Sequence, residues 1–371
     1  MFDLKNIFTN VTSQEENKEN SELPPEIVSR LTRTIQNLPV ASEHTKALQS
    51  SLEEALTKWQ QEEDSSNELV ILSSPVEPLF KIIRETVNNW QPPDEWQIKM
   101  LSFTTRPQKF FNISQILKSD LGLDVEANYN ENSPKLKQLI VIPSLELCFL
   151  RQIYGLDGIE YLRELIFKDT SHFWLIGCNN LAWEYLDWVY KVTAYFEKSI
   201  TLPPLEGSQM QQELMPVLAN TKIKLNWNGE SSEEREKRLK NHFDRLAKTA
   251  DGSLAIAAEL WWRSLSPLPE EKNNSVENTV VKFDKIKLPE LPSNLTTEDR
   301  YLLFSLLLHQ DMTLEHLTLS LGDLESTIQF QLQKLLQTGI IKREGWFFSI
   351  NPVHFPRLKS YLKHNNFITG V

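Results

Sequence analysis

Glycine is scarce in this chain, and its scarcity excludes a large class of nucleotide sites. The 371 residues include 11 glycines, well below the usual share of about 7%. The first is Gly122, and no glycine is followed by lysine. The phosphate-binding loop G-x-x-x-x-G-K-[ST] is therefore absent, and so is the dinucleotide fingerprint G-x-G-x-x-G.

Cysteine, long apolar runs and positive charge are also in short supply. Two cysteines, Cys148 and Cys178, are too few for a disulfide framework or a zinc site. No apolar run approaches the roughly 20 residues that cross a bilayer, and the N-terminus lacks the pattern of a secretory signal. A balance of 39 basic against 50 acidic residues gives a net charge of −11, which disfavours nucleic-acid coating and anionic membranes. We expect a cytoplasmic protein without membrane contact.

The usual catalytic and metal-binding spacings are missing as well. The 7 histidines show neither H-x-x-x-H nor H-E-x-x-H with a third ligand, so no metal site is predicted. No G-x-S-x-G elbow occurs. We therefore predict no catalytic residue, no metal and no cofactor.

What is present divides the chain into six segments. The first is polar with few large apolar side chains, which is typical of a mobile tail. Apolar residues then recur at helical spacing, as at Ile27, Leu31 and Ile35, which predicts helices. The predicted segments are a tail at 1–24, N-terminal helices at 25–66, an α/β core at 67–204, a helical lid at 205–268, a linker at 269–292 and a winged helix at 293–371.

The α/β core is predicted from apolar runs that alternate with helical patterns. The runs lie at 69–74, 97–103, 136–142 and 171–178, and residues 196–202 lead out of the core. Strands that read as nearly continuous apolar runs are typical of a parallel sheet covered on both faces.

The last segment has the pattern of a compact module. Thr296 is placed to cap a first helix, and two further helices are predicted at 313–319 and 323–337. Gly339 follows the third helix as a C-terminal cap would, and a hairpin is predicted around Glu344-Gly345. Three helices and a two-stranded wing indicate a winged helix, with a closing helix after Pro356.

This order of parts resembles that of AAA+ and related STAND-type P-loop ATPases. The resemblance runs from about Glu68 to the C-terminus. It implies an α/β fold, a parallel-sheet P-loop-NTPase-like core with a helical lid and a C-terminal winged-helix domain. In that family a nucleotide-binding loop follows the first core strand. An acidic pair lies at the end of the third strand, and a polar sensor residue lies at the end of the following strand.

The loop after the first predicted strand departs from the family's pattern. Phosphate binding needs convergent backbone amides and a cation, but this loop contains two prolines, which have no N–H, and Glu77, which repels phosphate. We interpret it as a structural turn. The alternative is an unorthodox anion site formed by Ser73, Ser74 and Lys81.

The other two family positions are only partly filled. Pro143 and Ser144 stand where the acidic pair would end the third strand, and Glu146 is the nearest carboxylate. We interpret Glu146 as a charge at a helix N-terminus. Asn179 and Asn180 fit the sensor position, although asparagine is common at strand ends.

An arginine and the tryptophans have structural and functional interpretations. Arg151 is a candidate interface arginine, and the alternative is an ion pair with Asp157 or Glu160. The tryptophans of the last core strand and the lid are predicted to be core and domain-interface residues rather than a platform for bases. These are Trp174, Trp183, Trp188, Trp261 and Trp262.

The winged helix leaves two kinds of partner open. Seven basic and seven acidic residues between Leu291 and Val371 make it neutral. Its third helix carries Ser326, Gln329 and Gln333, which could read base edges. Protein contact is the favoured hypothesis and DNA contact the alternative. The basic residues that would touch a nucleic-acid backbone are Lys342, Arg343, Arg357 and Lys359.

Three functional hypotheses follow. The first is a non-catalytic interaction, scaffold or regulatory protein on a degenerate AAA+-like fold. It would bind a protein partner or a related ATPase subunit, and it could form an oligomer. The second is a DNA-binding regulator. The third is an ATPase with an aberrant loop, which requires Lys81 or a partner subunit to supply the missing charge.

Overall fold

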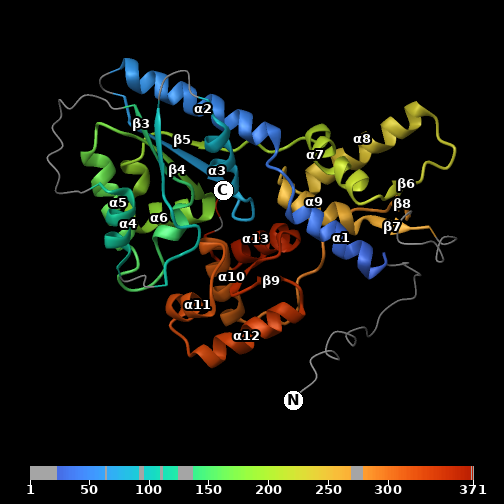
Figure 1. The fold of residues 1–371 in the computed structure, drawn as a ribbon. Coiled ribbons are helices and arrows are strands. Elements are labelled where there is room, and N and C mark those ends of the chain that lie inside the picture. The colour runs from blue at the N-terminus through green and yellow to red at the C-terminus, as the bar shows by residue number, and fades with distance from the viewer. Residues whose placement is uncertain are drawn as a thin grey trace.

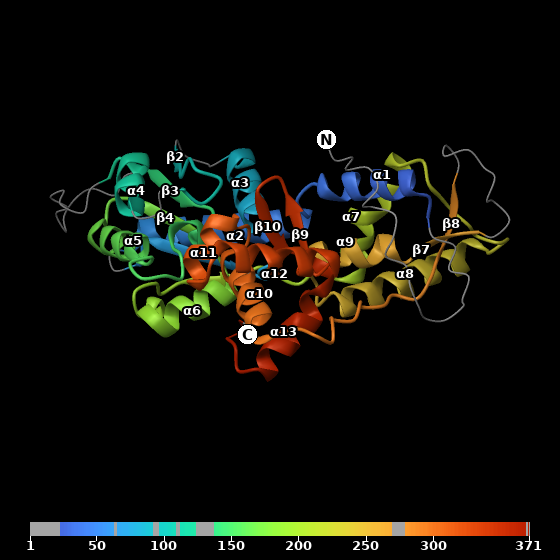
Figure 2. The same ribbon diagram turned by 90° about the horizontal axis from the view of Figure 1, so that it is seen from below.

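The computed structural model describes residues 23–62, 65–91, 96–108, 112–123, 137–268, 279–368 and 370. Residues 1–22 of the predicted tail lie outside these ranges. Figure 1 shows a sheet core beside a helical part, with a C-terminal module (residues 293–371) below them. Seen from below, the C-terminal module lies across the junction of the other two parts (Figure 2).

A five-stranded parallel sheet forms the core, and it confirms the predicted α/β fold class. The strand order is β2-β3-β4-β1-β5, and every neighbouring pair is parallel. The strands are β1 (Glu68–Ser73), β2 (Gln97–Met100), β3 (Gln138–Ile142), β4 (Phe173–Asn179) and β5 (Ser199–Thr201).

Helices cover both faces of the sheet, which explains the continuous apolar runs of its strands. In β4, Phe173 and Leu175 face one hydrophobic cluster, and Trp174 and Ile176 face the other. The first cluster includes α2 and α3, and the second includes α4, α5 and α6. The helices are α2 (Ser42–Gln61), α3 (Leu79–Asn89), α4 (Ile113–Leu121), α5 (Asp157–Lys168) and α6 (Asn180–Tyr190).

The helical part is built from three helices and a small sheet. Helix α1 (Pro25–Gln36) packs against α7 rather than on the parallel sheet. The segment predicted as a linker holds strand β8, whose Val281 is buried. This short apolar run is flanked by polar and proline-rich sequence, so its local pattern does not predict a strand. The elements are α7 (Gly207–Asn220), β6 (Lys224–Leu225), α8 (Ser232–Thr249), α9 (Leu254–Arg263), β7 (Leu265–Pro267) and β8 (Val280–Phe283), with sheet order β6-β8-β7.

The C-terminal module has the elements predicted for a winged helix, in the predicted order. The Thr296 side chain accepts a hydrogen bond from the Asp299 amide, as predicted for the cap of α10. Gly339 follows α12 in the left-handed region. The elements are α10 (Thr297–His309), α11 (Leu314–Leu321), α12 (Glu325–Gln337), the antiparallel pair β9 (Ile341–Glu344) and β10 (Phe347–Ile350), and α13 (Phe355–His364).

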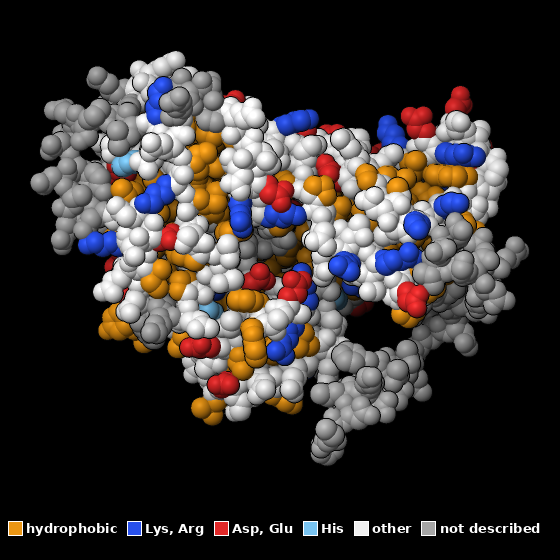
Figure 3. Space-filling model, viewed as in Figure 1, with side chains coloured by type: hydrophobic (Ala, Val, Ile, Leu, Met, Phe, Trp, Pro, Cys, Tyr) orange, Lys and Arg blue, Asp and Glu red, His pale blue; other side chains and the backbone are white. Residues whose placement is uncertain are grey.

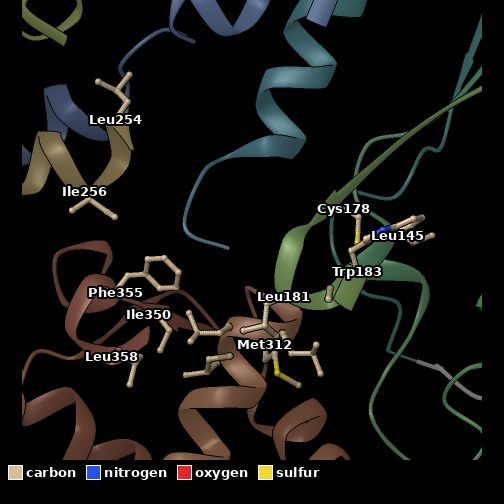
Figure 4. Close-up of a cluster of buried hydrophobic side chains, with 14 of the residues drawn as sticks. Leu145, Cys178, Leu181, Trp183, Leu254, Ile256, Met312, Ile350, Phe355 and Leu358 are labelled. Atoms are coloured by element: carbon tan, nitrogen blue, oxygen red, sulfur yellow. The ribbon is translucent and has the colours of Figure 1, made fainter. Parts of the chain in front are cut away.

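One hydrophobic cluster joins all three parts. Leu181 of the sheet core, Ile256 of α9 and Phe355 of α13 are buried in it, and Figure 4 shows side chains from the three parts converging. Trp174, Trp183 and Trp261 are buried as predicted, whereas Trp188 is 68% exposed. The prediction for Trp188 is therefore wrong, because its position on α6 faces away from the core.

Candidate functional site at the carboxyl end of the sheet

Three predicted positions meet at one edge of the parallel sheet. Strand β4 ends at Asn179 and lies between β1, which ends at Ser73, and β3, which ends at Ile142. The loop after β1, Pro143-Ser144 and Asn179-Asn180 therefore share the carboxyl edge, where ligands of open α/β sheets bind.

The loop after β1 is a turn closed by its own backbone. The Glu77 amide donates to the Ser74 carbonyl oxygen at 3.0 Å, and the Leu79 amide donates to the Glu77 carbonyl oxygen at 2.8 Å. The Ser73 hydroxyl donates to the Ser74 carbonyl oxygen at 3.2 Å. These contacts support the structural-turn interpretation, because two loop amides bond within the chain.

Lys81 does not converge with the two serines. Its ammonium donates to the Leu38 carbonyl oxygen and lies 3.8 Å from the Glu85 carboxylate. Ser73 and Ser74 line a different cavity from Lys81. The alternative anion site of Ser73, Ser74 and Lys81 is therefore not assembled, because α3 directs the lysine toward the connection between α1 and α2.

Glu77 places a carboxylate at the N-terminus of α9. The carboxylate is in a residue only 7% exposed, and it accepts hydrogen bonds from the Ser253 hydroxyl and, at 3.3 Å, from the Ala255 amide. A helix N-terminus attracts anions through its unpaired amides and its dipole. The anion-binding end of α9 is thus occupied by a side chain of the loop after β1.

We expect Glu77→Ala to lower the free energy of unfolding by about 1–2 kcal/mol, since it removes a helix cap. Ser253→Ala removes a neighbouring cap, so the double variant should lose less than the sum of the two single losses. Urea unfolding measures all three values. Glu85→Ala, on the partly exposed side of α3, is the control and should stay within about 0.5 kcal/mol of the parent. A Glu77→Ala loss as small as that of the control would contradict the capping role.

The cavity beside this loop is small and poor in positive charge. It measures about 280 Å³ and takes residues from all three parts, including Ser74, Asp251 and Lys359. Lys359 is the only lysine or arginine in its described lining, which also holds Glu77 and Asp251. Ligand pockets usually measure about 300–1,000 Å³, and phosphates are held most strongly by charge-assisted hydrogen bonds from arginine or lysine.

The carboxyl edge of β3 and β4 is closed by a buried polar network. Glu146 is 1% exposed and accepts hydrogen bonds from the Ser144 hydroxyl at 2.7 Å and from the Asn179 amide. Burial raises the pKa of Glu146, and the hydrogen bonds oppose that rise. The Asn179 side chain accepts from the Ala182 amide at 2.8 Å, which caps α6, and donates to the Leu308 carbonyl oxygen at 3.2 Å. The sensor-like Asn179 thus ties the sheet to α10.

Arg106 is the central cation of this network, and the sequence analysis missed it. It is 3% exposed and donates to the carbonyl oxygens of Phe149 at 3.2 Å, of Glu146 at 2.5 Å and of His309 at 3.4 Å. Burial lowers its pKa to about 10, so it stays charged at neutral pH. It lies in a polar stretch without periodicity, and no local signal marks it as buried.

His309 and Arg151 complete the contact with α10. The His309 ring accepts from the Arg151 amide at 3.1 Å, and burial lowers its pKa well below the usual value, which keeps it neutral. The Arg151 guanidinium donates to the Ser305 hydroxyl at 3.4 Å and lies 6.0 Å from the Tyr301 ring. Its described partners are on α10, so the predicted ion pair with Asp157 or Glu160 is wrong.

The basic residues predicted to contact nucleic acid do not form one surface. Lys342 lies 3.3 Å from the Glu344 carboxylate. Arg343 donates to the Gly345 carbonyl oxygen at 2.8 Å. Arg357 makes two 2.7 Å bonds to the Glu290 carboxylate, while Lys359 lines the cavity described above. In Figure 3, acidic and basic side chains are interspersed over the C-terminal module.

The third helix of the module, α12, borders a groove lined by polar, charged and aromatic side chains. Gln329, Gln333, Glu325 and Arg343 line it together with Trp346, which is 77% exposed. Glu325, at the start of α12, adds a negative charge to this groove. The guanidinium of Arg343 is already over the Trp346 ring, 5.9 Å from its centre.

Comparison with known proteins adds a likeness of fold. No family model and no curated protein matches this chain. Among solved structures, it is similar to Cdc6p from Pyrobaculum aerophilum, at 12% identity over 88% of this chain and 96% of that one, with a TM-score of 0.37. It is similar to a RuvB variant from Thermotoga maritima, at 14% identity over 85% and 94%, with a TM-score of 0.35. The ORC1 protein of Aeropyrum pernix, solved in complex with DNA, matches at 11% identity over 89% and 94%, with a TM-score of 0.35. The likeness concerns the fold, and it assigns no activity to this chain.

Two further features bear on the kind of site. Within the described ranges, no helix combines the length and apolar character that a membrane span requires. The same ranges contain no group of three or more histidine, cysteine, aspartate or glutamate side chains placed to hold a metal ion.

Proposed function

We propose that this chain is a non-catalytic interaction protein built on an AAA+-like fold. The observation that carries the proposal is the occupied carboxyl end of the sheet. Glu77 caps α9 there, and α10 covers the ends of β3 and β4 through Asn179 and Arg106. The sheet acts as a framework that holds the helical part and the C-terminal module in place.

The charges at this edge support a role without catalysis. Phosphoryl transfer relies on positioned cations and a metal held by carboxylates. Here Arg106 bonds to three backbone carbonyl oxygens, Lys81 bonds to Leu38, and Glu146 accepts bonds from Ser144 and Asn179. These three side chains are engaged in contacts that hold the fold.

Phosphate release from ATP in the presence of Mg²⁺ tests the proposal. We expect the parent protein and Lys81→Ala to release phosphate at the same background rate, because Lys81 is directed away from the carboxyl edge. Steady turnover by the parent that disappears in Lys81→Ala would overturn the proposal in favour of an ATPase with an aberrant loop.

We further propose that the C-terminal module, as a winged helix, contacts protein rather than DNA. Lys342, Arg343 and Arg357 are partnered within the chain, and the module is neutral. Fluorescence anisotropy with labelled duplex DNA at two salt concentrations checks this, and we expect no binding at the lower one. Binding that weakens steeply with salt and with Lys342→Ala/Arg343→Ala would contradict it.

A further inference from the structure

Several exposed apolar side chains lie in or beside one depression of the described surface. Ile153 and Tyr301 line it, together with Tyr185 and Leu321. Three more exposed apolar residues adjoin it: Tyr154 follows Ile153, Leu324 follows the lining residue Asp323, and Trp188 lies one helical turn from Tyr185. Exposed apolar groups that gather in this way mark interaction surfaces. We call these residues and the depression the Ile153 patch.

The loop that carries Ile153 and Tyr154 is built to hold them outward. Ile153 is 80% exposed and Tyr154 is 76% exposed. The Leu150 amide donates to the Gly155 carbonyl oxygen at 2.9 Å, and the Gly155 amide donates to the Gln152 carbonyl oxygen at 3.1 Å. A side chain at Gly155 would place its Cβ 1.9 Å from the Leu150 carbonyl oxygen, so the closed loop requires glycine there.

Backbone strain at Tyr154 accompanies this exposure. Tyr154 has a φ of 61°, a left-handed conformation that is costly for a bulky residue. A side chain that is mostly exposed gains little from packing within its own chain. The closed loop holds Tyr154 in this conformation, and a rigid loop reduces the ordering cost of a contact with another molecule.

The floor and rim of the depression indicate the chemistry of its occupant. It measures about 540 Å³, and Glu298 and Asp323 stand in its lining. Arg151 lies there with its guanidinium bonded to Ser305, and its Nε has no hydrogen-bond partner among the described residues. The nearby Arg300 is engaged with Thr297 and Asn365. An apolar surface with acidic groups at its rim suits a segment with apolar and basic side chains.

A second copy of this chain is a poorer occupant than a different protein. A two-fold contact through the Ile153 patch would bring Glu298 and Asp323 of each copy toward the same acids of the other, and like charges across an interface are costly. The net charge of −11 adds to that repulsion.

We infer that the Ile153 patch docks a basic amphipathic segment of a partner protein. This inference rests on the proposed interaction function and names the chemistry of the partner. Ile153 and Tyr154 would enter apolar surface of the segment, as aromatic and aliphatic anchors do in protein interfaces. Glu298 and Asp323 would pair with its lysine or arginine side chains.

The test uses a fluorescein-labelled amphipathic helical peptide of leucine and lysine, with a leucine–glutamate peptide of the same pattern as its counterpart. We expect the full-length chain to bind the lysine peptide at least tenfold more tightly than the glutamate peptide in fluorescence anisotropy. Ile153→Ser/Tyr154→Ser should weaken that binding about tenfold, and Glu298→Gln/Asp323→Asn about threefold. Equal affinity for the two peptides, or no binding of either, would overturn the inference.

Matched controls separate docking from general charge attraction and from misfolding. Phe330→Ser removes another exposed aromatic residue, which lies outside the Ile153 patch, and Glu233→Gln/Glu236→Gln removes two charges from α8. Both should leave the affinity unchanged, and an equal loss in either would overturn the inference. Tyr154→Gly relieves the left-handed strain, so it should weaken peptide binding while leaving the unfolding midpoint unchanged or raised. Unweakened peptide binding in this variant would contradict a role for Tyr154.

Two results distinguish this inference from a contact between two copies of the chain and from a failure of the proposed non-catalytic function. Sedimentation velocity shows whether the chain alone forms dimers. Dimers that are lost in Ile153→Ser/Tyr154→Ser would identify a second copy as the occupant of the patch and overturn the inference. ATP turnover together with normal peptide binding would contradict the proposed non-catalytic function and would still support the docking surface.

Discussion

Arg106→Ala is expected to lower the free energy of unfolding by about 3–5 kcal/mol, because each buried polar group left unpaired costs about 1–3 kcal/mol. The substitution leaves three buried carbonyl oxygens without their donor, those of Glu146, Phe149 and His309. It also removes a positive charge that interacts with the buried Glu146. Because one of those carbonyls is on α10, the contact of the C-terminal module with the sheet should loosen too. Urea unfolding measures the loss, and limited proteolysis reports the loosening.

Two variants establish the cause of that loss. Adding Glu146→Gln to Arg106→Ala should restore part of the stability, because glutamine keeps an acceptor for Ser144 and Asn179 without a buried charge. Arg343→Ala, which removes an exposed arginine, should change the free energy of unfolding by less than about 1 kcal/mol. An Arg106→Ala loss below about 1 kcal/mol, or no recovery in the double variant, would show that the network does not hold α10 to the sheet.

Trp261→Ala is expected to cost about 3–5 kcal/mol of unfolding free energy, the usual loss for a large aromatic residue in a core. Trp261 is fully buried on α9, within the cluster that joins the three parts. Its indole N–H has no hydrogen-bond partner among the described residues. Trp261→Phe should therefore lose much less, since it keeps most of the packing and removes the unpaired donor.

The neighbouring Trp262 provides a matched control for this prediction. It is partly buried, its indole N–H donates to Glu259 at 3.0 Å, and the Arg263 guanidinium lies 4.8 Å from its ring centre. Trp262→Ala should cost about 1 kcal/mol, because most of what it loses is at the surface. Similar losses for the two alanine variants in chemical unfolding would contradict the assignment of Trp261 to the shared core.

The spacing of apolar residues predicted the helices and strands well, because the buried face of each element repeats with a fixed period. Ile27 and Leu31 lie on one buried face of α1, and the apolar runs of β1, β3 and β4 follow from a sheet that is covered on both faces. The family resemblance named three loops that follow core strands, and parallel strands bring such loops to one edge.

Contacts between distant segments could not be predicted in this way. Glu77 meets Ser253 across 176 positions of the chain, and Arg106 meets His309 across 203, with no periodic signal at either end. The direction of Lys81 depends on the carbonyl oxygen of Leu38, which only the packing of α3 brings near. Ile153 and Tyr154 are large apolar residues, which a sequence pattern would place in the core. Their exposure follows from a loop closed around Gly155.

Calorimetric titration with ATP and Mg²⁺ up to millimolar concentration tests the central claim most directly. With Glu77 on the N-terminus of α9 and Lys81 turned away, we predict no heat of binding and no change in the unfolding midpoint. A nucleotide present at about 100 times its dissociation constant would stabilise the fold by about 2.7 kcal/mol, which thermal unfolding detects easily. Micromolar binding with such a shift would contradict the account and establish the carboxyl edge of the sheet as a nucleotide site.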